Sequence, residues 1–135
     1  MKRFLIALVV LVWPSVGTAQ PEAADVLAQR QTDLTALAEH LGALHRLHQV
    51  CHPEEQPDLF RRRMMSLVRL EVPKGSTRLQ MIDAFNTGYR DATLRHAICG
   101  REARADYAGE AEKALALTEQ LYSPFRPLDV SQASP

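Results

Sequence analysis

Proline and glycine divide this chain into four long segments, and the positions of these helix-breaking residues constrain the fold more than any other feature. The residues between the breaks are good helix formers, and no run of alternating β-branched residues is long enough to compete as a strand. The sequence therefore predicts an all-α protein. The breaks are Pro21, Pro53, Pro57, Pro73, Gly75, Gly100, Pro124 and Pro127.

We expect helices over about residues 24–50, 57–70, 76–99 and 101–122, with Ser76 as the cap of the third and Gly100 as its stop. Short connections make successive helices antiparallel, so the predicted fold is a single four-helix up-down bundle over residues 20–122. Residues 123–135 are predicted to form a flexible tail. The inward faces are expected to carry, in chain order, Leu34, Leu37, Leu41 and Leu44; Phe60, Met64, Leu67 and Val68; Ile82, Phe85, Tyr89, Ala92 and His96; and Ala103, Tyr107, Ala111, Ala114, Leu115, Thr118 and Leu121.

The first 19 residues have the three-part form of a secretory signal peptide. Lys2 and Arg3 precede an apolar run that ends at Trp13, and small residues lead up to Ala19. The apolar run is too short to cross a bilayer, which takes roughly 20 residues. We expect cleavage near Ala19 and a periplasmic protein with no transmembrane segment, and an uncleaved anchor is the alternative. After cleavage the chain has 14 basic and 16 acidic residues, a balance that does not suggest nucleic acid as a partner.

Cys51 and Cys99 are the only cysteines in the chain. In an exported protein an even cysteine count favours a disulfide. An up-down bundle places the C-terminal ends of the first and third helices together, so the disulfide and the topology support each other. Gly42 and Gly88 lie at similar distances from this bridge, which predicts a close crossing of these helices unless the two glycines are incidental.

Histidines gather near the predicted bridge. His48 and His96 each lie three residues before a cysteine, so their imidazoles are expected to approach each other, and His52 could join them from the loop. Such a cluster could hold a transition metal. The spacing matches no established metal motif, however, and an inward histidine is more often a hydrogen-bonded core residue. No cofactor is predicted.

A second group consists of His45, Asn86, Tyr89 and Arg90. One interpretation is structural, with Asn86 and His45 forming hydrogen bonds to each other or to a backbone group at the helix crossing. The other is functional, with all four side chains lining a small polar ligand pocket. The run RRRMM at 61–65 similarly fits either a solvated face or a patch that meets an anionic surface.

Catalytic signatures are missing from the sequence. It contains no G-x-S-x-G, no H-E-x-x-H and no glycine-rich phosphate loop. Glu39 and His40 are adjacent, so on a helix they point about 100° apart and cannot form a dyad by themselves. We therefore expect a protein that is not an enzyme.

Several blocks together resemble a known family. LGALHRLHQVC at 41–51, the pair Met64 and Met65, AFNTGYR at 84–90 and Cys99 are similar, in order and spacing, to a small exported alphaproteobacterial family of unknown function. In that family an aromatic residue, often Trp, tends to occupy the position of Phe60, and Arg is common at that of His48. This chain has Phe rather than Trp at the first position and His rather than Arg at the second, so a metal site that used His48 would not be a family property.

The resemblance implies an exported helical protein and supplies no reaction. We expect a non-enzymatic protein of the cell envelope whose partner is another envelope protein or an envelope component. The alternative is a small-ligand or metal-binding module at the end of the bundle that carries His45, His48 and His96.

Overall fold

The computed structural model describes residues 21–71 and 75–125. The predicted signal peptide and residues 126–135 of the predicted tail lie outside this part of the chain. None of the described helices is both long and apolar enough to cross a membrane.

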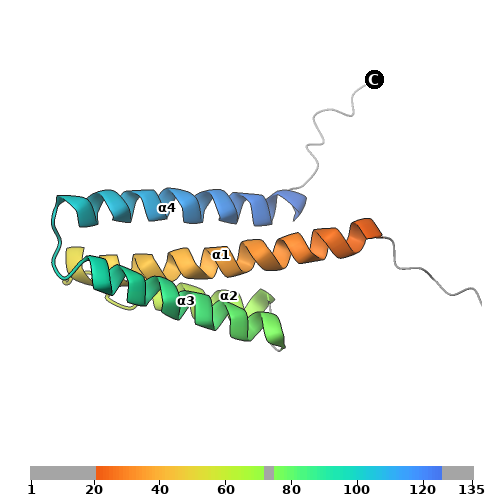
Figure 1. The fold of residues 1–135 in the computed structure, drawn as a ribbon, viewed down its shortest axis with the longest axis horizontal. Coiled ribbons are helices and arrows are strands. Elements are labelled where there is room, and N and C mark those ends of the chain that lie inside the picture. Colours follow the sequence, from red (N-terminus) through yellow and green to blue (C-terminus); the bar gives the residue numbers. More distant parts are fainter. Residues whose placement is uncertain (1–20, 72–74, 126–135) are drawn as a thin grey trace, which may run out of the picture.

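Four α-helices account for most of the described chain: α1 (Pro21–Cys51), α2 (Leu59–Glu71), α3 (Ser76–Arg95) and α4 (Arg101–Tyr122). A short 3₁₀ helix, η1 (Ser123–Phe125), continues α4. Successive helices run in opposite directions (Figure 1), and the described residues include no strand. The predicted all-α, four-helix up-down bundle is confirmed.

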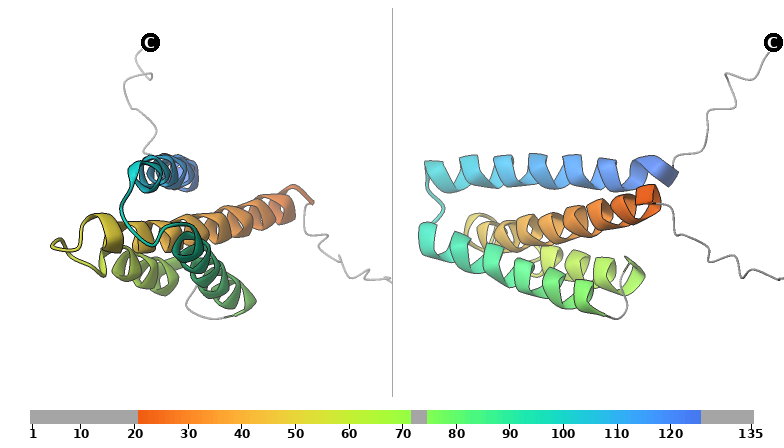
Figure 2. Two further views of the ribbon diagram at one scale, coloured as in Figure 1. Left: turned by 60° about the vertical axis from the view of Figure 1, so that its left-hand side comes forward. Right: turned by 45° about the vertical axis from the view of Figure 1, so that its right-hand side comes forward.

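Helix α1 is the centre of the bundle, and the other three helices all pack against it. It lies between α4 on one side and α2 and α3 on the other (Figures 1 and 2). Half of the buried apolar residues belong to α1, and burial of each leucine contributes about 1.5–3 kcal/mol. The core consists of Leu34, Leu37, Ala38, Ala43, Leu44 and Leu47 from α1, with Met64, Val68, Met81, Ala92, Ala103 and Ala114 from the others.

Helices α1 and α3 cross with their backbones in contact. A Cβ atom added at Gly42 would collide with the carbonyl oxygen of Phe85, and one added at Gly88 would collide with the carbonyl oxygen of Glu39. Only glycine leaves room for two backbones at this separation. The predicted close crossing of the two helices is confirmed.

A disulfide joins Cys51 to Cys99 with their Cα atoms 4.9 Å apart, as predicted. Helix α3, however, ends at Arg95 rather than at Gly100, because His96 adopts an extended conformation (φ −131°, ψ 92°). Cys99 therefore lies in the loop before α4. The bridge spans 48 residues, for which loop entropy predicts a stabilisation of about 4 kcal/mol.

The start and the inward face of α3 differ from the expectation. Ser76 is the first helical residue, and Gly75 occupies the capping position without a side-chain hydrogen bond. Gly75 has φ 103°, a conformation that favours glycine. The buried side of α3 centres on Met81 and Gly88, so Ile82 is 37% exposed; the backbone contact at Gly88 decides which face of the helix turns inward.

The predicted inward face of α4 is correct in part, because Ala103, Tyr107, Ala114 and Leu121 pack in or against the core. Ala111, Leu115 and Thr118 are exposed. The inward positions follow a three-and-four spacing that includes a glutamate: Ala103, Tyr107, Glu110, Ala114, Leu117 and Leu121. Reliance on apolar residues wrongly included Ala111 and missed Glu110, which lies on the inward face.

Candidate functional site: a groove between α1, α2 and α3

An open groove of about 520 Å³ lies where α2 and α3 diverge over α1. Its volume falls in the range of small-molecule sites, roughly 300–1,000 Å³. Helix α1 contributes His45 and Gln49. The walls are formed by Arg61, Met64, Met65 and Val68 of α2 and by Arg78, Ile82, Phe85, Asn86 and Tyr89 of α3.

Helical periodicity explains why these side chains meet. Residues three or four apart lie on one face of a helix, and each helix gives the groove one such strip. On α1 the strip is His45 and Gln49; on α2 it runs from Arg61 to Val68, and on α3 from Arg78 to Tyr89. The groove is therefore a product of three helix faces and not of a loop.

His45 is the most buried polar residue of the groove, with 6% of its surface exposed. Its ring lies between two aromatic rings, 5.7 Å from Phe85 and 5.5 Å from Tyr89 between centroids. The Tyr89 hydroxyl donates to Oε1 of Gln49 at 3.2 Å, and Nε2 of Gln49 lies 3.4 Å from Nε2 of His45. These contacts hold the imidazole in one orientation.

The same hydrogen bonds assign the proton of His45. Because the amide nitrogen of Gln49 can only donate, Nε2 of His45 accepts and the neutral ring carries its proton on Nδ1. Nδ1 is buried and has no hydrogen-bond partner among the described residues. A buried unpaired donor costs about 1–3 kcal/mol.

The surroundings of His45 favour its neutral form. Burial lowers the pKa of His45 below its ordinary value of 6.5, and the positive charge of Arg61 and the neighbouring His48 lower it further. Asp58 acts in the opposite direction and does not outweigh them. At neutral pH this part of the groove therefore presents an uncharged imidazole beside a guanidinium.

The run of three arginines at 61–63 divides into different roles. Arg62 donates to Oδ1 of Asp58 at 2.6 Å and to Oε1 of Gln56 at 2.9 Å. Arg61 lines the groove and forms no hydrogen bond or ion pair within residues 21–71 and 75–125. Arg62 therefore fits the interpretation of this run as a solvated face, whereas Arg61 lines the groove.

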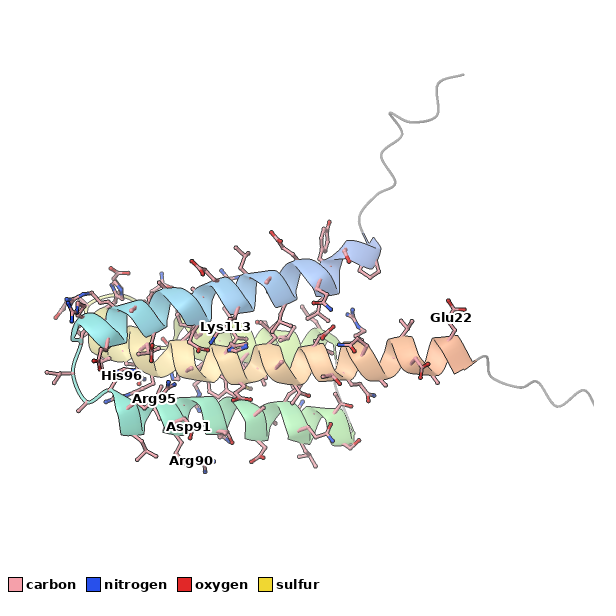
Figure 3. All side chains as sticks on the ribbon, turned by 45° about the horizontal axis from the view of Figure 1, so that its top comes forward. Glu22, Arg90, Asp91, Arg95, His96 and Lys113 are labelled. Atoms are coloured by element: carbon pink, nitrogen blue, oxygen red, sulfur yellow. A yellow bond between two sulfur atoms is a disulfide. The ribbon has the colours of Figure 1, made fainter. Side chains whose placement is uncertain are left out.

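Of the four predicted pocket residues, the structure brings three together. His45, Asn86 and Tyr89 line the groove. Arg90 is exposed, donates to Oγ1 of Thr87 at 3.1 Å, and lies on the side of α3 that faces away from α1 (Figure 3). The expected pairing of Asn86 with His45 is wrong, because Gln49 takes that place.

Three polar residues that line the groove were not among the predicted pocket residues. Gln49 follows His45 by one helical turn, so the helix period could have indicated it. Arg61 was considered only as part of a surface run. Arg78 reaches the groove because α3 begins at Ser76 and turns this face toward α2, which depends on packing that no local pattern records.

Of the three histidines proposed for a metal, His48 and His52 contact each other, whereas His96 has a different partner. The ring of His48 stacks on His52 at 5.3 Å, and its Nδ1 lies 3.2 Å from the hydroxyl of Tyr107. Nε2 of His96 lies 2.8 Å from Oδ2 of Asp106, and no ring contact joins His96 to His48. The described part of the chain has no group of three or more His, Cys, Asp or Glu side chains placed to hold a metal ion. The expected approach of His48 to His96 is therefore replaced by contacts of each with α4.

A further polar contact, which was not predicted, joins α1 to α4. Nδ1 of His40 lies 2.6 Å from Oε2 of Glu110, and Nζ of Lys113 lies 3.0 Å from the other carboxylate oxygen. Burial alone would raise the pKa of Glu110, but the hydrogen bonds from His40 and Lys113 together lower it below its ordinary value of 4.5. Glu110 is therefore an ionised group at the α1–α4 interface.

Comparison with known proteins identifies the family. The model of a family described as protein of unknown function, DUF2385, matches residues 30–125. The chain belongs to the DUF2385 family. No curated protein and no solved structure matches the chain.

The match to DUF2385 covers the whole groove and both cysteines, together with all four sequence blocks that suggested an uncharacterised family. The expected membership of an uncharacterised family is confirmed. The alphaproteobacterial origin of the family and its export stay predictions.

Proposed function

We propose that this chain is an exported, non-enzymatic binding protein of the cell envelope that holds a small ligand in the groove between α1, α2 and α3. The observation that carries the proposal is the groove itself, a cleft of about 520 Å³ whose lining combines apolar side chains with His45, Asn86, Tyr89 and Arg61. Small-molecule sites are typically apolar clefts with a few convergent polar groups. The groove has this composition.

The size of the groove favours a small ligand over a protein partner at this face. Stable protein interfaces bury about 800 Å² on each partner and are usually broader than a cleft between two short helices. Support for the periplasm comes from the leader-like segment at 1–19 and from the disulfide between Cys51 and Cys99, because such bonds persist in oxidising compartments.

Location and ligand binding are tested separately. For location, the protein is recovered from the periplasmic fraction of cells that express the full chain, and its intact mass is measured without reduction. We expect a chain that starts at Gln20 and carries one disulfide. Recovery of the full-length chain in the cytosol with two free thiols would contradict the proposed location.

For ligand binding, the purified protein is analysed by native mass spectrometry for a bound small molecule that is released on denaturation. Ile82→Trp fills the groove from a partly exposed position on α3 and should abolish the bound mass. Leu79→Trp is the matched control, because Leu79 is exposed on the same helix and does not line the groove. Equal retention of the molecule by both variants would exclude the groove as its site.

A further inference from the structure

The groove has a one-sided charge. Arg61 and Arg78 line it from opposite walls, and no aspartate or glutamate is among its described lining residues. The neighbouring hollow along α1 and α3 differs, because Glu39 and Asp83 line it. The positive charge of Arg61, which forms no hydrogen bond or ion pair within the described residues, therefore favours an anion in the groove over a cation.

Arg61 has the features of an anion-binding residue. Its neighbour Arg62 is occupied by Asp58 and Gln56, whereas Arg61 has no such partner in the described chain. A guanidinium presents parallel N–H donors that match the two oxygens of a carboxylate. Burial and the positive charge of Arg61 lower the pKa of His45, whose ring lines the same groove.

Five of the other side chains that line the groove are apolar. Met64, Met65 and Val68 of α2 face Ile82 and Phe85 of α3. Methionine side chains adjust to ligands of different shape because they are unbranched and polarisable. An anion that filled this space would need an apolar portion next to its charged head.

We propose that the ligand is an amphipathic carboxylate, with its head group beside Arg61 and His45 and a single apolar tail between α2 and α3. This inference rests on the proposed function and names the ligand class of the same groove. The bidentate geometry of Arg61 selects a carboxylate over a point-like anion. The volume of the groove suits one tail.

The inference is tested with four soluble probes that vary head and tail independently. Octanoate has both features, octylammonium reverses the charge, 1-octanol removes it, and acetate lacks the tail. Isothermal titration calorimetry on the disulfide-bonded protein should show saturable binding of octanoate, at least about tenfold tighter than binding of octylammonium or 1-octanol, because opposite charge and hydrogen bonding act on the head. Acetate should give no saturable heat.

Arg61→Gln should weaken octanoate binding about tenfold, because it removes a charge-assisted hydrogen bond. Arg63→Gln, two residues away on the same helix and absent from the groove lining, should leave the affinity unchanged. Asn86→Asp keeps the shape of a lining side chain while adding a negative charge, and should weaken octanoate and strengthen octylammonium.

An independent readout is the titration of His45 followed by NMR. Bound carboxylate offsets the positive charge of Arg61, so octanoate should raise the pKa of His45 in the wild type and much less in Arg61→Gln. The other groups that face this imidazole are Asp58, His48 and Tyr89. These three groups are present both with and without octanoate, so they do not explain a difference in the pKa of His45 between the two titrations.

The outcomes separate this inference from the proposed function. If 1-octanol or octylammonium binds as tightly as octanoate, or if Arg61→Gln binds octanoate like the wild type, the carboxylate assignment is overturned while the groove remains a binding site. If none of the probes binds and Ile82→Trp releases no molecule from the native protein, both the proposed function and the inference fail.

Discussion

The two sides of α1 pack against their neighbouring helices through different kinds of contact. On one side α3 lies with its backbone against that of α1 at Gly42 and Gly88, close to a disulfide. On the other side α4 meets α1 through small alanines and through polar side chains, among them the pair of His40 and Glu110. The first interface depends on shape and covalent linkage, whereas the second depends partly on charge.

This difference predicts different responses to perturbation. The backbone contact at Gly42 and Gly88 tolerates no added atom. A titratable group on this side of α1 is His45, whose ring lies against Phe85 and Tyr89, so pH sensitivity is expected here only below pH 6.5. The α1–α4 interface tolerates changes in side-chain size more easily, and its ionised glutamate makes it sensitive to acid. The groove lies on the α3 side of α1, so its α1 and α3 walls belong to the rigid interface.

The largest effect is expected on removing the disulfide. The double variant Cys51→Ser, Cys99→Ser should lose about 4 kcal/mol of unfolding free energy, because the bridge limits the entropy of a 48-residue loop in the unfolded chain. Urea unfolding of the variant and the oxidised wild type measures the loss. A loss below about 1 kcal/mol would mean that packing alone holds α1 and α3 together.

The second effect concerns the glycine crossing. Gly42→Ala should destabilise the protein by about 3 kcal/mol, because its methyl group meets the carbonyl oxygen of Phe85 and the helices must separate. Gly109→Ala is the matched control: nothing lies near an added Cβ there, and alanine is favoured over glycine within a helix by up to about 1 kcal/mol. If Gly42→Ala were as stable as the control, the backbone contact would be wrong.

A smaller effect is expected at the α1–α4 interface. Glu110→Gln should cost about 1 kcal/mol at pH 7, because the amide retains an acceptor for His40 but loses the charge. The lowered pKa of Glu110 gives stability that is present above pH 4.5 and lost as pH falls through the folded-state pKa. The difference between wild type and variant should therefore shrink in this acidic window.

Thermal unfolding from pH 7 to pH 3 measures this difference. Glu119→Gln, at an exposed position of the same helix, is the control and should show no pH-dependent difference from the wild type. A constant gap between wild type and Glu110→Gln across the window would exclude a stabilising charge at the α1–α4 interface.

The effect expected at His45, which lines the groove, is absent at neutral pH and appears only as the pH falls below 6.5. Because the pKa of His45 is lowered in the folded protein, the unfolded chain binds a proton at this group more readily than the folded chain does. The contribution of His45 to the free energy of unfolding is therefore complete above pH 6.5 and decreases as the pH falls from 6.5 toward the folded-state pKa. A single group can contribute at most about 1.4 kcal/mol per pH unit. His45→Gln should remove this contribution, so that its stability relative to the wild type changes below pH 6.5 and is constant above it.

The features that sequence analysis predicted correctly have local causes. Gly42, Gly88 and the two cysteines were informative because each residue type restricts what can lie next to it. Glu110 was missed because its inward position depends on His40, 70 residues away. Arg61 could not be distinguished from Arg62 because the difference depends on where Asp58 and Gln56 lie, which only the folded turn before α2 determines.

The end of α3 is an intermediate case. Gly100 was a reasonable stop signal, yet the chain leaves the helix at His96. Nε2 of His96 lies 2.8 Å from Oδ2 of Asp106 on α4, and the next residues bring Cys99 to Cys51. Two long-range contacts thus coincide with an earlier helix end than the glycine alone predicts.

The position of the disulfide has a consequence for a chain exposed to proteases. Helices α2 and α3 lie within the segment that the bond between Cys51 and Cys99 closes. A single cut in the connection from His52 to Asp58 would therefore leave two fragments in one covalent molecule, and both walls of the groove would stay attached to α1. Under oxidising conditions a nicked protein would keep its mass apart from one added water, and only reduction would separate the pieces.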